Sequence, residues 1–165
     1  MDVFVQKKDG VAEKIDANVV QLVTFRLADA EYAIDIMQTK EIIRMEKVTL
    51  IPNAPDFVEG VINLRGNVIP VIDLKKRFHL REAEGVKNGC IVIVRIQKME
   101  MGIIIDAISK VVHIPQADVQ PPPAVLAGSG ERYITGVAKV DERLVMILDL
   151  MKLFSFEEQE TLKKM

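Results

Sequence analysis

Few side chains in this chain of 165 residues have the chemistry that catalysis needs. The two histidines, His79 and His113, belong to no HExxH or similar metal-binding spacing. Gly128-Ser129-Gly130 has the composition of a phosphate loop, but no lysine follows it and no strand precedes it. Asp73 and Asp149 could serve as general acid and base, yet each occupies the same place in an internal repeat, where helix capping explains both. The sequence therefore predicts no catalytic residues, no metal site and no cofactor.

The chain consists of two copies of one unit. Residues 57–78 recur 76 positions later as residues 133–154, and residues 23–36 recur 69 positions later as residues 92–105. The difference between the two shifts is an insertion after Pro121, in a Pro- and Gly-rich stretch that is typical of a surface loop. A residue type kept in both copies points to a shared structural cause, whereas a residue that matters in only one copy needs another explanation.

Short apolar stretches bounded by turn residues predict strands in both copies. From Val19, the runs VVQLVTFRL and YAIDI indicate two strands joined by a tight turn, and CIVIVRI and MGIII repeat the pattern. Arg65-Gly66-Asn67 between two apolar runs indicates a hairpin turn in which glycine supplies a positive φ. Pro70 lacks a ladder donor and predicts an edge strand or a bulge. Residues 37–44 and 106–113 fit either a helical turn or an irregular strand.

About five short strands per copy predict an all-β fold of two packed five-stranded barrels with a shared core. Ser155 and Glu158 form a capping box that predicts a C-terminal helix. Which strands belong to which barrel does not follow from the sequence. The expected segments are a flexible N-terminal arm over residues 1–18, the double barrel over residues 19–154 with repeat halves at about 21–78 and 90–154, and the helix over residues 155–165.

Composition excludes several classes of partner. The formal net charge is −2, and no basic cluster is longer than Lys75-Lys76-Arg77, so nucleic acid is not expected as a partner. Charges interrupt the N-terminal residues, and no apolar run has the length of a signal peptide core or a membrane span. The single cysteine, Cys90, opens an apolar run and has no partner for an internal disulfide. These features predict a cytoplasmic protein without membrane insertion.

Two charged positions differ between the copies. The counterpart of Arg65 is Asp141, and the counterpart of Glu41 is Lys110, so the repeated fold does not require either residue. Arg65 fits the solvated tip of a hairpin, which is the usual place of a turn arginine. It also fits a guanidinium presented to the carboxylates or carbonyls of a partner.

The run FVEGVINLRGNVIPVIDLKKRF, with its NLRG turn and D-L ending, resembles the signature of the CheW family, the scaffold proteins of bacterial chemotaxis. The flanking segments YAIDI, EIIR and VTLIPNAPDF fit the same family in order and spacing, and the resemblance covers roughly residues 21–154. It implies two five-stranded SH3-like barrels and a protein that is not an enzyme. It also implies an adaptor that links the cytoplasmic helical tip of chemoreceptors to the regulatory domain of the histidine kinase CheA. Such an adaptor would be cytoplasmic and recruited to receptor arrays at the inner face of the membrane.

The resemblance also implies which residues meet each partner. Thr39 departs from the family, in which an aliphatic residue often stands at this position. The expected receptor-binding residues are Ile36, Thr39, Glu41, Arg65, Cys90 and Val111, and the expected kinase-binding residues are Val58, Glu59 and Gly60.

The expected receptor contact is a helix laid into a groove between the barrels, with polar residues at the rim fixing its register. A second surface would hold the kinase, so that one small body raises the effective concentration of the two partners. The alternatives are a related double-barrel regulatory module, either from the kinase itself or from another two-component pathway, and a small-molecule-binding β-barrel or enzyme.

Overall fold

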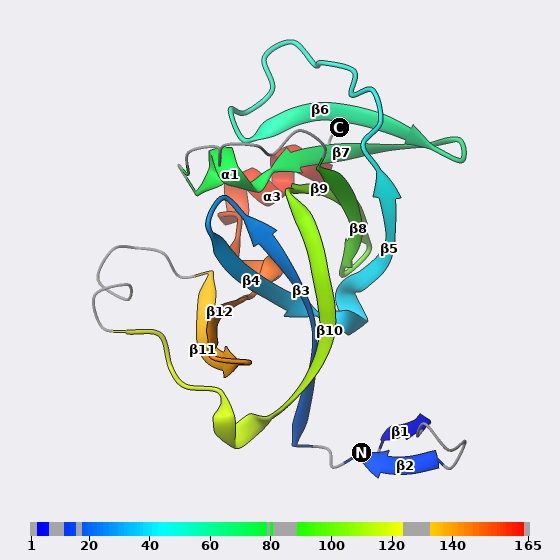
Figure 1. Cartoon of the computed structure of the whole chain (residues 1–165). Helices are drawn as coiled ribbons and strands as arrows, with labels where there is room; N and C mark the ends of the chain where they lie inside the picture. The colour runs from blue at the N-terminus through cyan, green and yellow to red at the C-terminus, as the bar shows by residue number, and fades with distance from the viewer. Residues whose placement is uncertain are drawn as a thin grey trace.

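A computed structural model shows two small β-barrels stacked one above the other (Figure 1). It describes residues 3–6, 12–15, 18–78, 80, 89–123 and 133–163. Two of the groups considered above, His79 and Gly128-Ser129-Gly130, lie outside the described residues, as does most of the insertion after Pro121.

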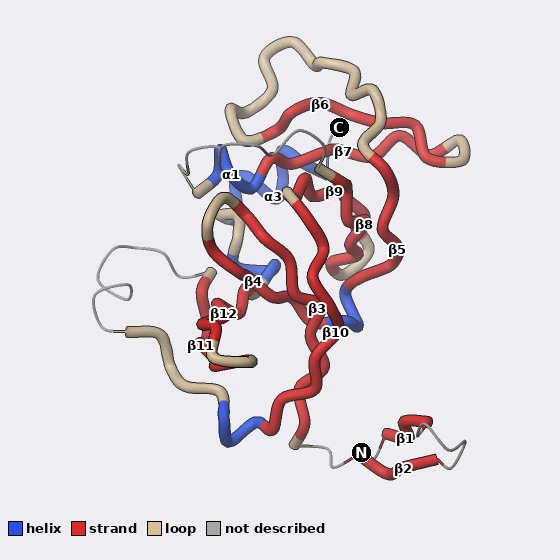
Figure 2. The backbone as a smooth tube through the Cα atoms, viewed as in Figure 1, coloured by secondary structure: helices blue, strands red, loops and turns tan. Residues whose placement is uncertain are grey.

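Strands make up most of the described chain, as the tube in Figure 2 shows. The first repeat contributes β3 (Val19–Leu27), β4 (Ala30–Asp35), β5 (Thr39–Arg44), β6 (Val58–Leu64) and β7 (Asn67–Asp73). The second repeat contributes β8 (Cys90–Ile96), β9 (Met99–Ile105), β10 (Ala107–Pro115), β11 (Ile134–Val140) and β12 (Arg143–Leu148). The helical elements are η1 (Ile36–Gln38), α1 (Leu74–Arg77), η2 (Gln116–Asp118), η3 (Leu150–Lys152) and α3 (Phe156–Lys163). The predicted all-β fold of two packed five-stranded SH3-like barrels with a C-terminal helix is confirmed.

Each barrel takes strands from both repeats. Barrel 1 has the strand order β10-β3-β4-β12-β11, and barrel 2 has the order β5-β8-β9-β7-β6. The chain passes from barrel 1 to barrel 2 through η1, and it returns at a bend at Asp106 between β9 and β10. The repeat halves therefore do not form separate barrels. Separation of the repeat halves would break the β3–β10 ladder of barrel 1 and the β5–β8 ladder of barrel 2, so we expect the two halves to unfold as one unit.

The irregular points of the ladders also repeat. Both segments that fit either a helical turn or an irregular strand contain bulged strands, and in the first of them η1 comes before the strand. The register shifts lie between Thr39 and Glu41 in β5, between Ile108 and Lys110 in β10, between Val58 and Gly60 in β6, and between Ile134 and Gly136 in β11.

Gly60 is fixed by a close approach of backbone. A Cβ atom on Gly60 would lie 2.2 Å from the carbonyl oxygen of Thr49, which pairs with Val61 in an isolated bridge. On Gly136, a Cβ atom would lie 2.7 Å from Cγ1 of Val119. The same crowding in both copies explains why glycine stands at both positions.

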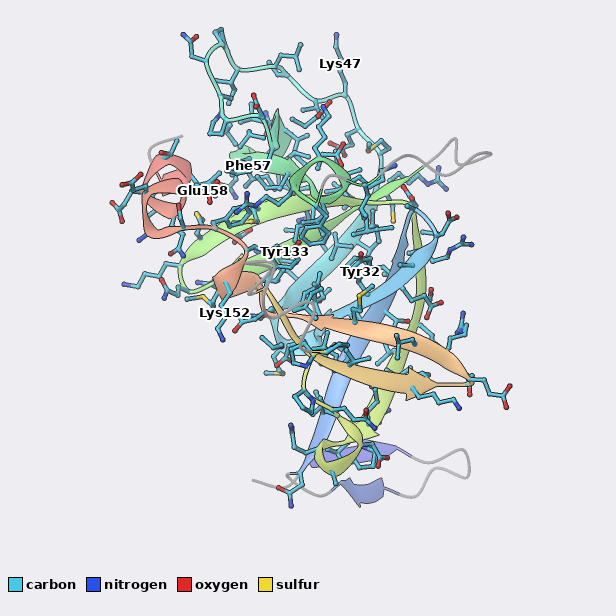
Figure 3. All side chains as sticks on the ribbon, turned by 90° about the vertical axis from the view of Figure 1, so that its left-hand side faces the viewer. Tyr32, Lys47, Phe57, Tyr133, Lys152 and Glu158 are labelled. Atoms are coloured by element: carbon cyan, nitrogen blue, oxygen red, sulfur yellow. The ribbon has the colours of Figure 1, made fainter. Side chains whose placement is uncertain are left out.

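Three apolar clusters hold the fold together. One fills barrel 1, one fills barrel 2, and the largest lies between the barrels. In the cluster between the barrels the rings of Phe78 and Tyr133 stack at 4.4 Å, and the ring of Tyr32 lies 5.6 Å from that of Phe78. Figure 3 labels Tyr32 and Tyr133 in this part of the molecule. Leu74 is fully buried there, and burial of such a side chain contributes about 1.5–3 kcal/mol. The shared core thus joins the two barrels into one body.

Aspartates cap the short helices, as the sequence predicts. The Asp73 carboxylate accepts hydrogen bonds from the backbone N–H groups of Lys75 and Lys76, and Asp149 accepts one from Met151. This structural role accounts for the occurrence of aspartate at the same place in both copies.

The predicted capping box starts α3. The Ser155 hydroxyl accepts a hydrogen bond from the Glu158 N–H at 3.1 Å, and the Glu158 carboxylate accepts one from the Ser155 N–H at 2.8 Å. Both residues therefore satisfy donors that the first helical turn leaves unpaired.

Two expectations need correction. Within the segment predicted as a flexible arm, strands β1 (Val3–Gln6) and β2 (Ala12–Ile15) pair antiparallel, and their hairpin lies apart from the barrels in Figure 1. Pro70 predicted an edge strand or a bulge. Its strand is not at an edge, because β7 lies between β6 and β9, and the bulge of the β6–β7 ladder lies on β6, between Val58 and Gly60. Pro70 is tolerated because β7 pairs with β9 only from Val71 onward.

Candidate functional site

The β6–β7 turn presents Arg65 at the tip of a hairpin. Arg65 has φ 51° and Gly66 has φ 87°, as a two-residue turn with two positive φ angles requires. The Asn63 side chain accepts a hydrogen bond from the Gly66 N–H at 2.9 Å and supports the turn. The predicted hairpin is therefore present, and its geometry fixes the direction in which Arg65 leaves the barrel.

Arg65 is paired within the protein. Its two terminal nitrogens donate hydrogen bonds of 2.9 and 2.8 Å to the two carboxylate oxygens of Glu41 on β5. The Arg65 side chain remains 68% exposed, and that of Glu41 is 26% exposed. The two residues thus present one forked ion pair on the surface. It joins the β6–β7 hairpin tip to β5, the edge strand on the opposite side of the barrel 2 sheet.

The ion pair shifts both titrations. The hydrogen bond from Arg65 holds the pKa of the Glu41 carboxyl below its usual range, and the hydrogen bond to Glu41 raises the pKa of Arg65. Both groups are exposed to solvent, so we expect the pair to add little to stability. The pair presents oriented charges at the surface.

We expect the Glu41 carboxyl to titrate below the range of an ordinary glutamate in the wild type and within that range in Arg65→Gln, because the variant lacks the guanidinium. Because the pKa of Glu41 is lower in the folded protein than in the unfolded chain, the ion pair stabilises the fold above the unfolded-state pKa. This stabilisation is lost as the pH falls through the folded-state pKa. Carboxyl-selective NMR titration of both proteins measures the shift. Identical Glu41 titrations would contradict the pairing.

The second repeat has the same ion pair with opposite charges. Lys110, the counterpart of Glu41, pairs with Asp141, the counterpart of Arg65. The hydrogen bond from Lys110 also lowers the pKa of Asp141. The sequence showed each position as a separate difference between the copies. The reversal of both signs together is the signal that could have identified two ion pairs.

Apolar residues accompany each ion pair. Ile42 and Val68 in barrel 2 are 45% and 63% exposed, and their counterparts Val111 and Leu144 in barrel 1 are 48% and 62% exposed. Each barrel therefore carries a charged pair and two exposed aliphatic side chains at equivalent positions, and the barrels differ in the direction of the charge.

Ile36 lies in η1, where the chain passes between the barrels, and Val111 lies in β10 of barrel 1. Val111 is opposite Val23 of β3, and the other neighbour of Val23 is Ile34, two residues before Ile36. Ile36 packs against the core between the barrels, and Met37 beside it is 86% exposed. Two strand spacings, about 10 Å, and two further residues therefore separate Val111 from Ile36.

Thr39 lies at the bulge of β5, two residues before Glu41, and its hydroxyl donates a hydrogen bond to the carbonyl of Asp35 at 3.4 Å. Cys90 is half-buried and pairs with Arg44 at the other end of β5. Cys90 lies three residues along β8 from Ile93, the residue opposite Glu41, and this distance is about 10 Å. The structure therefore groups Thr39 with the ion pair and does not place Cys90 beside it.

Burial also raises the pKa of the Cys90 thiol. The thiolate is the reactive form, so we expect iodoacetamide to alkylate Cys90 in the folded protein at least about tenfold more slowly than a free thiol at the same pH. Mass spectrometry over time gives the rate, and the protein unfolded in urea is the control. Equal rates in the folded and unfolded protein would show that the thiol is freely accessible.

The three predicted kinase-binding residues have different environments. Val58 is 7% exposed, and Gly60 is buried against Thr49. Only Glu59 reaches the surface, where its carboxylate accepts a 2.6 Å hydrogen bond from Lys76. The adjoining loop carries Leu50, which is 75% exposed and which the sequence did not single out.

The described residues contain no group of three His, Cys, Asp or Glu side chains that could hold a metal ion. In the same part of the chain, no helix is both long and apolar enough to cross a membrane.

Two SH3-like barrels with paired charges and exposed aliphatic residues on their outer faces define a class of protein-interaction modules. Residues 21–158 match the family model of the CheW-like domain. The chain is 47% identical over 146 residues to a chemotaxis protein CheW of Treponema pallidum, with 86% of each chain covered. It is 33% identical over 138 residues to the CheW of Klebsiella aerogenes, covering 84% of this chain and 83% of that one.

A solved structure also matches this chain in fold. The scaffolding protein TtCheW of Thermoanaerobacter tengcongensis superposes with a TM-score of 0.74 at 38% identity, covering 84% of this chain and 90% of that one. The chain belongs to the CheW-like family, as the sequence resemblance predicts.

Proposed function

We propose that this protein is a chemotaxis adaptor that links the cytoplasmic helical tip of chemoreceptors to the regulatory domain of a CheA-type histidine kinase. The relatives are chemotaxis CheW proteins, and one solved relative is described as a scaffold. The observation that carries the proposal is the exposed, forked ion pair of Glu41 and Arg65, with aliphatic side chains beside it on a rigid double barrel.

The receptor side combines shape and charge. Ile36 would supply apolar contact where the barrels meet and the exposed Val111 would supply it on β10, while Thr39 lies two residues before Glu41. Glu41 and Arg65 offer donors and acceptors in a fixed direction, which suits polar groups along one face of a receptor helix. Cys90 packs against the core between the barrels, about 10 Å along the ladder from the ion pair.

The kinase side is a separate surface around Glu59. Gly60 allows the Thr49 backbone to approach β6, and this approach positions the loop that carries Leu50. Val58 anchors β6 from inside the core. An exposed leucine beside an exposed ion pair suits contact with another barrel, in which an apolar centre is surrounded by polar groups.

Binding of both partners would place the protein in the cytoplasm, at receptor arrays on the inner face of the membrane. The protein itself would carry out no reaction. It would act by holding the two partners at high effective concentration.

We expect Glu59→Arg to weaken binding to the kinase regulatory domain at least about tenfold and to leave receptor binding unchanged, because reversal of a rim charge opposes the complementary surface. Surface plasmon resonance with each partner immobilised separately measures both affinities. Asp29→Arg, which reverses an exposed charge in the β3–β4 turn, is the matched control. An equal loss for both partners, or for the control, would contradict two independent surfaces.

A further inference from the structure

A cavity lies between barrel 2 and the C-terminal helix α3. Its volume is about 840 Å³, within the range of small-molecule sites. The residues predicted to contact the receptor or the kinase do not line it. It is lined by Asn67–Pro70 of β7, Ile96–Glu100 of the β8–β9 turn, Leu150, Met151 and Phe154 around η3, and Gln159, Leu162 and Lys163 of α3.

The cavity lies where two parallel strands diverge. β7 and β9 pair only over Val71–Asp73 and Gly102–Ile104, so the earlier residues of each strand are not joined by a ladder. Pro70 has no N–H group with which to extend the pairing. In barrel 1 the parallel pairing of β12 with β4 is equally short but starts two residues earlier, at Val145 and Glu31, the counterparts of Ile69 and Glu100.

In barrel 1 an ion pair bridges the diverging strands. The Arg143 guanidinium at the start of β12 donates a hydrogen bond of 2.5 Å to Glu31 of β4, and the Ser109 hydroxyl donates one of 3.4 Å to the same carboxylate. Glu31 is 8% exposed, so the bridge lies against the barrel.

Barrel 2 has no arginine at the corresponding place. The counterpart of Arg143 is Asn67, the counterpart of Glu31 is Glu100, and the counterpart of Ser109 is Lys40. The ammonium group of Lys40 on β5 donates to Glu100 at 2.9 Å, so the cation reaches the carboxylate from the side of β9 that faces away from β7 in the strand order. Asn67 is too short and uncharged to make the bridge of barrel 1. The repeat thus provides a closed and an open version of one site within the same chain.

The lining combines an apolar interior with a basic rim. Val68, which is 63% exposed, and the half-buried Met99 and Met151 provide the accessible apolar surface. The other apolar residues of the lining are buried: Ile69, Pro70, Ile96, Leu150, Phe154 and Leu162. Lys98 and Lys163 are the basic residues of the lining, and Lys163 lies 3.5 Å from the exposed Glu160. Glu100, the acidic residue of the lining, is already paired with Lys40.

We propose that this cavity binds a small amphiphile with an apolar tail and a carboxylate head, such as a medium-chain fatty acid. The tail fits the apolar walls, and the carboxylate meets Lys98 and Lys163 at the rim. The proposal is independent of the partners suggested above, because it concerns neither of their surfaces.

The ligand would also fasten the C-terminal helix. Arg77 holds the start of this region through hydrogen bonds of 3.0 and 2.8 Å to the Leu153 carbonyl and one of 3.1 Å to Glu158. Leu162 and Lys163 on α3 form one wall of the cavity, so a bound tail would join α3 to β7 and to the β8–β9 turn. A ligand that binds only the folded protein raises the unfolding temperature.

The test uses dodecanoate, below the concentration at which it forms micelles, in calorimetric titration and thermal unfolding. We expect saturable binding to the wild type, with a rise in the unfolding temperature. Asn67→Arg reproduces the arginine of barrel 1 and should weaken binding at least about tenfold, since its side chain would bridge to Glu100 across the opening. Gln116→Arg adds the same charge on the exposed η2 and should bind as the wild type does.

Head-group selectivity is tested by Lys98→Glu and by an uncharged dodecyl detergent. Weaker binding of dodecanoate to Lys98→Glu, and of the uncharged compound to the wild type, supports the assignment. Absence of dodecanoate binding, or equal binding to Asn67→Arg, would overturn the site, and equal binding of the uncharged compound would overturn the carboxylate. Sedimentation with phosphatidylglycerol vesicles without binding of free dodecanoate would show a membrane surface contact and also overturn the proposal.

Discussion

Arg65→Glu should reduce affinity for a receptor cytoplasmic fragment at least about tenfold, because it places two carboxylates where the forked ion pair presented a guanidinium. The unfolding temperature should change by no more than about 2 °C, since the pair is exposed. Calorimetric titration and thermal unfolding give the two values on the same preparation.

Barrel 1 supplies the control for this prediction. The double variant Glu41→Lys, Arg65→Asp copies the Lys110–Asp141 pair and restores an ion pair with reversed direction. We expect normal stability and binding that remains weak. Recovery of receptor binding in the double variant would show that the pair only supports the hairpin, and a strongly destabilised Arg65→Glu would show a structural role for Arg65.

Asp106→Ala should lower the free energy of unfolding by about 3–5 kcal/mol, because it leaves a buried ammonium group without its carboxylate. The Asp106 carboxylate lies 2.7 Å from the Lys75 ammonium group of α1 and accepts a 2.7 Å hydrogen bond from the Ala28 N–H in the β3–β4 turn. Both charged side chains are at most 10% exposed. This carboxylate therefore connects both barrels at the bend where the chain returns to barrel 1.

Urea unfolding of Asp106→Ala measures the loss, and the double variant Asp106→Ala, Lys75→Met is its control. We expect the double variant to be more stable than Asp106→Ala, because it removes the buried Lys75 ammonium group together with the Asp106 carboxylate. A loss below about 1 kcal/mol in Asp106→Ala would show that the ion pair is not important for joining the barrels.

The local structure could be read from the sequence because local signals specify it. The hairpin at Arg65-Gly66, the caps at Asp73 and Asp149 and the capping box at Ser155 each depend on residues a few positions apart. The strand exchange between the repeats could not be read in this way. Alternation along a strand shows which side chains face a core, but it does not specify which strand lies alongside.

The candidate site shows the same limit. Glu41 and Arg65 each stood out, but their contact joins different strands across the open side of a barrel. Cys90 was grouped with them by family resemblance, and the β5–β8 register separates it from them. The cavity beside α3 was not predicted, because it depends on the absence at Asn67 of an interaction that its counterpart Arg143 makes.

As an adaptor, one rigid double barrel would hold a receptor and a kinase at the same time. Co-sedimentation of a CheA-type kinase with vesicles that carry a receptor cytoplasmic fragment tests it most directly. Kinase should sediment with the vesicles in the presence of the wild-type protein, and much less with Arg65→Glu, with Glu59→Arg or without the protein. Equal sedimentation of the kinase in all four samples would contradict the adaptor function.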